Sequence, residues 1–74
     1  MSLTEEEALP KILEHWIEHN EHHIEEFRKW AEKAKGFGKD AIHDDIMEAA
    51  EHMDTANKTL TRALGRVQEG GISA

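Results

Sequence analysis

Cysteine is absent from this chain of 74 residues, and its absence limits how so small a domain is held together. Disulfide bonds and thiolate metal sites are excluded. A single core of this size supplies only ~3 to 5 kcal/mol of stability unless something reinforces it. We therefore expect reinforcement by oligomerisation or by a metal site made of histidine and carboxylate side chains.

Long apolar runs and an excess of basic residues are also missing. No stretch approaches the ~18 apolar residues of a membrane-spanning helix, and the first residues do not resemble a secretory signal. Sixteen acidic and nine basic residues give a formal net charge of -7. That charge disfavours nucleic acid and anionic membranes as partners. We expect a soluble, cytoplasmic protein that binds neither.

The sequence lacks the signatures of common enzyme sites. It contains no nucleophile paired with a base, no phosphate-binding loop and no cofactor motif, so we expect no enzymatic activity. The nearest match to the Glu-x-x-His pair of ferritin-like di-iron bundles is Asp40-x-x-His43. A redox di-iron enzyme is therefore a poor fit.

Apolar residues, by contrast, recur at four-three spacing in both halves of the chain, which is typical of helices that pack along a seam. The first seam is predicted to contain Leu9, Leu13, Trp16, Asn20, His23, Phe27, Trp30 and Ala34, and the second Ile42, Ile46, Ala49, Met53, Ala56, Leu60, Ala63 and Val67. The two tryptophans are accordingly expected in the core.

Proline and glycine mark the predicted helix ends. Pro10 suits a first turn, so the first helix is predicted over about 10–35. Residues 36–39 break the periodicity as a turn, with Gly36 suited to the C-cap. Asp40 is expected to cap a second helix over about 40–68. So short a turn forces an antiparallel hairpin in which residue numbers summing to about 75 lie side by side. The fold class is thus all-α, with residues 1–74 as one helical-hairpin domain.

An apolar flank beside the predicted seam indicates self-association. Its residues are Ile17, Ile24, Ala31 and Leu64, with Ala50, and a lone hairpin would leave them exposed. Because two helices bury too little surface to offset chain entropy, we expect a homodimer that forms an antiparallel four-helix bundle. Another domain of a longer protein would serve the same purpose.

Histidines point to a metal site on the other flank. At ~100° per residue, His15, His19, His22 and Glu26 form one face of the first helix. The expected register brings four side chains together as ligands, namely His19, His23, Glu26 and His52. Nitrogen and oxygen donors suit a divalent transition metal, which is Zn, Ni, Co, Cu or Fe. His43 with Asp40 and Asp44 is a second candidate cluster.

Two other interpretations remain open. Asn20 and Asn57 can hydrogen-bond across the seam and fix its register, while His23 donates to Glu26 or Glu48. The chain is then a structural or protein-interaction hairpin without metal. Alternatively, charged His23 and His52 repel each other below about pH 6.5 and loosen a pH-responsive assembly.

The string from His15 to His22, His-Trp-Ile-Glu-His-Asn-Glu-His, resembles small uncharacterised prokaryotic helical-hairpin domains. This resemblance covers about a third of the chain if the flanking helical residues are included. The resemblance implies no established activity, but it favours the interpretation that the histidines have a function.

Overall fold

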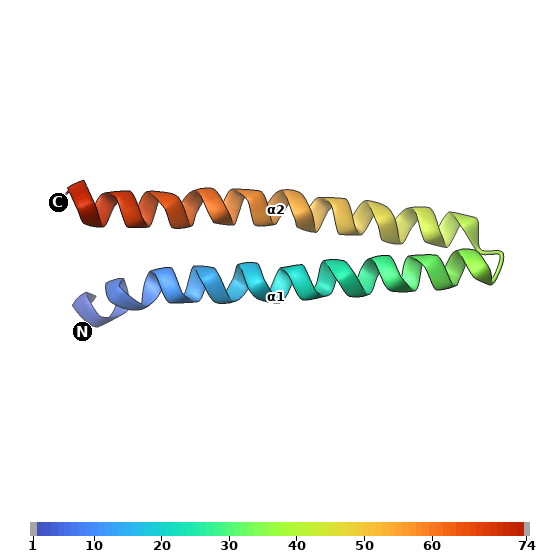
Figure 1. Ribbon diagram of the computed structural model, residues 1–74, viewed down its shortest axis with the longest axis horizontal. Coiled ribbons are helices and arrows are strands. Elements are labelled where there is room, and N and C mark those ends of the chain that lie inside the picture. Colours follow the sequence, from blue (N-terminus) through green and yellow to red (C-terminus); the bar gives the residue numbers. More distant parts are fainter. Residues whose placement is uncertain (1, 74) are drawn as a thin grey trace.

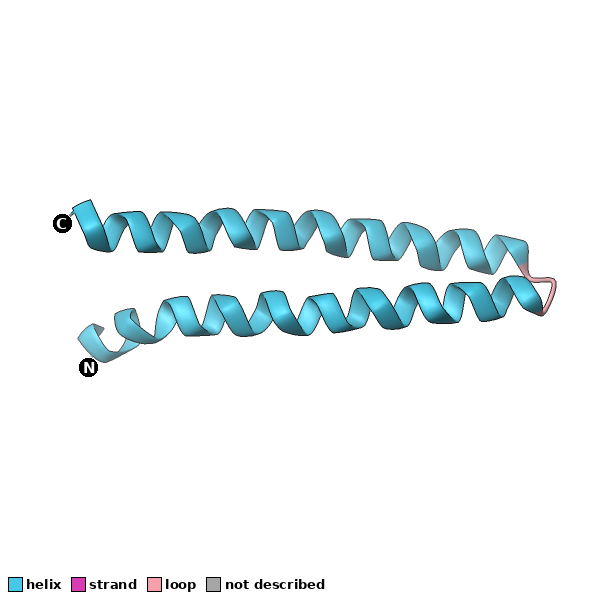
Figure 2. Cartoon of the chain, viewed as in Figure 1, coloured by secondary structure: helices cyan, strands magenta, loops and turns pink. Residues whose placement is uncertain are grey.

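Two long antiparallel helices make up the structure, a computed structural model that describes the backbone of residues 2–73 and the side chains of residues 5–69. Helix α1 spans Ser2–Gly36 and helix α2 spans Asp40–Ser73. They lie side by side, with both chain ends at the same end of the molecule (Figure 1). A short loop joins them (Figure 2). The molecule extends 55 × 19 × 13 Å, and the predicted all-α antiparallel hairpin is confirmed.

Both helices are longer than the sequence predicts. α1 begins at Ser2 and continues through Pro10, although proline lacks the N–H that would bond within the helix. The acidic residues that precede Pro10 favour the positive end of the helix dipole and support this first segment. α2 continues past residue 68 to Ser73, because glycine weakens a helix without forbidding it. Over the described residues, neither helix is apolar enough along its length to cross a membrane.

The turn between the helices is a Schellman motif centred on Gly38. The Lys39 N–H donates to the Ala34 carbonyl at 2.9 Å, and the Gly38 N–H donates to the Lys35 carbonyl at 2.9 Å. Gly38 has a φ of 78°, a backbone conformation that residues with a Cβ atom rarely adopt. The left-handed residue is therefore Gly38, and the expectation that Gly36 fills this role is wrong.

Helix α2 begins at Asp40, as predicted, but Asp40 is not the residue that caps it. The His43 N–H donates to the Lys39 carbonyl at 3.0 Å, so Lys39 precedes the first helical turn and Asp40 lies within it. An acidic side chain in the first turn is still favourable there, because it faces the positive end of the helix dipole.

The seam between the helices differs from the predicted seam by a rotation of both helices about their axes. On α2, Ala50 is buried, whereas Ile42, Ala49 and Ala56 of the predicted seam are exposed. Leu13, Ile24, Ala31, Ala34 and Ala50 are buried between the helices, whereas Trp16 and Trp30 are 49% and 55% exposed. The prediction that the tryptophans form the core of the hairpin is wrong, and so is the prediction that Ile24, Ala31 and Ala50 lie on an exposed flank. Small side chains near the turn let the two backbones approach closely, which an indole ring in the seam would prevent.

One polar pair lies in the middle of this seam. Asn20 Nδ2 donates to Asn57 Oδ1 at 2.9 Å, and Asn57 Nδ2 donates to the Ile17 carbonyl at 2.9 Å. Asn57 is the one buried polar side chain among the described residues. The predicted pairing of the two asparagines is confirmed, and their numbers sum to 77, which lies within a helical turn of the expected register.

Replacing each of the two turn glycines by alanine distinguishes the effect of backbone conformation from the effect of steric crowding. We expect Gly38→Ala to lower the free energy of unfolding by about 1 kcal/mol, because an L-residue is strained at positive φ. Gly36→Ala is the matched control, since Gly36 is helical and nothing lies within 4 Å of an added Cβ at either position. It should raise stability by up to about 1 kcal/mol. Urea unfolding followed by circular dichroism measures both, and equal losses would contradict the turn assignment.

Removal of the seam amide tests the polar pair. We expect Asn57→Ala to lower the free energy of unfolding by roughly 1 to 3 kcal/mol, because Asn20 then loses its partner in a partly buried seam. Thr55→Ala, at an exposed position of the same helix, should change it by less than about 0.5 kcal/mol. Both variants are compared in urea at one protein concentration. A neutral Asn57→Ala would show that the pair does not stabilise the hairpin.

Candidate metal site

A ladder of rings follows one face of α1 at intervals of four residues. The His15 and His19 rings stack with their centroids 6.0 Å apart, and His19 meets His23 edge to face at 4.5 Å. The Phe27 ring continues the ladder, 6.2 Å from His23. Residues four apart are neighbours on a helix surface, so the sequence spacing alone produces this ladder.

Two imidazole nitrogens of the ladder face each other. His19 Nε2 and His23 Nε2 lie 3.0 Å apart, so that one ring donates a proton to the other. Two nitrogens bound to one tetrahedral zinc ion at ~2.0 to 2.1 Å lie about 3.3 Å apart. The pair thus needs a shift of only a few tenths of an ångström to exchange its shared proton for a metal ion.

Glu26 lies next to this pair on the following turn. Its Oε1 atom is 3.9 Å from His23 Nδ1, too far for a hydrogen bond and close enough to orient the ring by charge. His19, His23 and Glu26 line one open hollow on the surface of α1, together with His22, Glu25 and Lys29. Three of the four predicted ligands are therefore gathered on one helix.

His52, the fourth predicted ligand, lies elsewhere. Its Nε2 atom is 3.5 Å from Glu48 Oε2 on its own helix, and its side chain is 75% exposed. It lines a different hollow, beside Glu51 and Thr55. The rotated seam turns this part of α2 outward, so the structure supports neither a shared site with His23 nor mutual burial of the two rings. Within the described residues, no three potential ligands form a group that could hold a metal ion.

The sequence analysis missed the interhelical partner of His43. His43 Nδ1 lies 3.0 Å from Asp44 Oδ1, and His43 Nε2 lies 3.8 Å from Glu32 Oε2 on α1. The side chain of His43 is 19% exposed. The predicted register contains the signal that identifies Glu32, because 32 and 43 sum to the expected 75. These contacts connect the helices near the turn.

Exposed apolar side chains lie before and after the histidine pair along the chain. Six large hydrophobic side chains are exposed among the described residues, namely Leu9, Ile12, Trp16, Trp30, Phe37 and Ile42. The first three precede the pair along α1, and the next two follow it. Lys33 covers part of one indole, with its Nζ 4.2 Å from the centre of the Trp30 ring. The hollow around the pair is thus polar within an otherwise aromatic surface.

Comparison with known proteins places the whole hairpin in one family. Residues 9–67 match the model of a family described as "Domain of unknown function (DUF8180)". An uncharacterised protein of Archaeoglobus fulgidus is 34% identical over 61 residues, which covers 82% of this chain and 97% of that protein. No solved structure matches. The matched residues include both helices and the turn, so the chain belongs to the DUF8180 family of small, uncharacterised domains.

Proposed function

We propose that this protein binds a divalent transition metal through His19 and His23, assisted by Glu26. The contact of 3.0 Å between the two Nε2 atoms carries the proposal. Two histidines one helical turn apart present their nitrogens to the same point, which is how helices chelate zinc. Because the donors are nitrogen, the suited ions are Zn, Ni, Co, Cu and Fe.

Glu26 supplies charge to the proposed site. A carboxylate hydrogen-bonded to a ligating imidazole fixes the ring and raises its basicity. The 3.9 Å separation of Glu26 from His23 Nδ1 supports that role, because a small movement of the exposed Glu26 side chain would complete the hydrogen bond. Residues 5–26 carry eight acidic side chains and one basic side chain. Their summed negative potential raises the local concentration of cations around the pair.

Calorimetric titration of the chelator-treated full chain with Zn²⁺ and Ni²⁺ tests the proposal. We expect saturable binding that weakens about tenfold or more in either His19→Ala or His23→Ala, because a single imidazole remains. His52→Ala is the matched control, since it removes an exposed imidazole outside the pair. Its affinity should equal that of the unchanged protein.

Two results would overturn this function. If metal binding is weak, has a fractional stoichiometry and is unchanged by His19→Ala, the measured heat comes from scattered surface imidazoles and not from the proposed site. If His52→Ala loses metal binding, His52 is a ligand and the metal lies between the helices, as the sequence predicts. Circular dichroism of each variant confirms that the helices persist.

A structural or protein-interaction role without metal is the second candidate. The six exposed large hydrophobic side chains favour it, because monomeric proteins rarely leave contiguous apolar surface uncovered. In that case chelators leave the assembly of the protein unchanged. We propose no enzymatic activity.

A further inference from the structure

Leu9, Trp16, His23, Trp30 and Phe37 follow one another at intervals of seven residues. We call them the aromatic stripe. Residues seven apart lie nearly above one another on a helix, so these side chains share one line along α1 and just past its end. Trp16, Trp30 and Phe37 are 49%, 55% and 70% exposed. Among the described residues, the stripe contains four of the six large hydrophobic side chains that are exposed.

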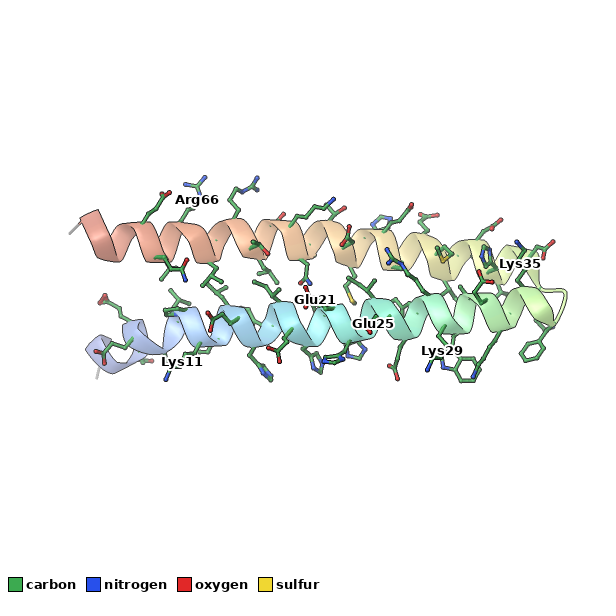
Figure 3. The ribbon with its side chains drawn as sticks, viewed as in Figure 1. Lys11, Glu21, Glu25, Lys29, Lys35 and Arg66 are labelled. Atoms are coloured by element: carbon green, nitrogen blue, oxygen red, sulfur yellow. The ribbon has the colours of Figure 1, made fainter. Side chains whose placement is uncertain are left out.

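Charged residues lie beside the aromatic stripe and on the other sides of the hairpin. Lys33 covers part of the Trp30 ring, and Glu26 lies next to His23. Two hollows between the helices are lined by polar and charged residues, among them Glu21, Arg28 and Asp54. Lys11 and Lys29 lie along the edge of α1 that is turned away from α2, and Arg66 lies on the far edge of α2 (Figure 3). The aromatic stripe is therefore bordered by charge, as the apolar centre of an interface is.

The size of the stripe fits a contact between two small proteins. At ~200 Å² per aromatic side chain, the exposed parts of its three aromatic residues amount to roughly 350 Å². Leu9, Ile12 and the two imidazoles bring the area to the order of 600 Å² per copy, close to the ~800 Å² that each partner buries in a standard interface. A two-helix hairpin needs such additional burial to be stable.

The order of residues in the stripe selects a second copy of this chain as the partner. Read from either end, the stripe runs from an apolar residue to tryptophan and then to His23 at its centre. A twofold axis at His23 places Trp16 of one copy beside Trp30 of the other. Such self-complementarity is what a twofold interface requires.

Charge along α1 supports the same antiparallel contact. Residues 5–26 have eight acidic side chains and one basic, whereas residues 27–36 have four basic and one acidic. With the axis at His23, residues 27–36 of each copy lie against residues 10–19 of the other, which have two acidic side chains and one basic. Residues 20–26, with three acidic side chains, face the same segment of the other copy, where a bound cation would offset their like charge. Opposite potentials across an interface favour association and fix its register.

We infer that two copies pair through their aromatic stripes and that His23 of each copy binds one shared metal ion on the twofold axis, with His19 of each copy beside it. This inference rests on the proposed function. One chain brings only two imidazoles within reach of a metal ion, whereas tetrahedral zinc takes four ligands. The second copy adds its own imidazoles, in the way that helical bundles assemble metal sites from facing helices.

Sedimentation of the full chain, with and without Zn²⁺, tests the pairing. We expect a dimer that Zn²⁺ strengthens, with one ion bound per two chains. Trp16→Glu places a charge twice in the contact and should abolish the dimer. Thr55→Glu adds the same charge at an exposed position on α2 and should leave the dimer intact.

Disulfide trapping tests the geometry even if Trp16→Glu fails to fold, since the chain has no cysteine of its own. We expect His23→Cys to form a disulfide dimer on oxidation, because the two Cβ atoms meet at the axis. Thr55→Cys should remain monomeric under the same conditions. Ala56 is exposed on α2, next to the Asn57 that pairs with Asn20, and so lies near the level of His23. Preferential crosslinking of His23→Cys to Ala56→Cys would overturn the pairing of α1 with α1.

The metal stoichiometry separates the two proposals. One Zn²⁺ bound per monomer, lost in His23→Ala, would overturn the shared site and leave the proposed function standing. A dimer without saturable Zn²⁺ binding would overturn both. Half an ion per chain, with loss of both the ion and the Zn²⁺-strengthened dimer in His19→Ala, supports the shared site.

Discussion

The hydrogen bond between Asn20 and Asn57 is the constraint on which the arrangement of this hairpin depends. An amide in a packed seam costs free energy unless it is paired. Here each asparagine finds the other, and Asn57 also reaches the Ile17 carbonyl. In the seam that contains this pair, Ile24 and Ala31 face inward, and Trp16 and Trp30 remain outside. The surface available to a metal or a partner follows from that packing.

The sequence was sufficient to predict the two helices, their antiparallel order, the register and the asparagine pair. It did not predict how the two helices are rotated about their axes. On α1, Leu13, Asn20, Phe27 and Ala34 belong to both possible seams. On one side of that shared line lie Trp16, His23 and Trp30, and on the other Ile17, Ile24 and Ala31. Hydrophobicity alone does not decide which of the two sets packs against α2. The close approach of the backbones at a short turn decides for the smaller side chains, which a periodicity argument does not weigh.

The same rotation explains which part of the candidate site could be predicted. His19, His23 and Glu26 belong to one helix, so their proximity follows from helical spacing and holds whichever seam forms. His52 depended on the orientation of α2 relative to α1, and it lies in a different hollow. Local geometry is thus readable from residue numbers, whereas a site between helices requires the packing to be known.

The proposed dimer gives each helical contact one polar pair near its middle. In the inner seam, Asn20 and Asn57 satisfy each other, and such a pair specifies register at a cost in stability. In the outer contact, the Nε2 atoms of His19 and His23 share one proton, which a metal ion would replace. Burying that pair without a cation would cost free energy, because imidazole nitrogens would lose water without gaining partners. A bound metal ion would offset this cost. The inner seam is therefore complete with protein atoms alone, whereas the outer contact would couple its assembly to the metal.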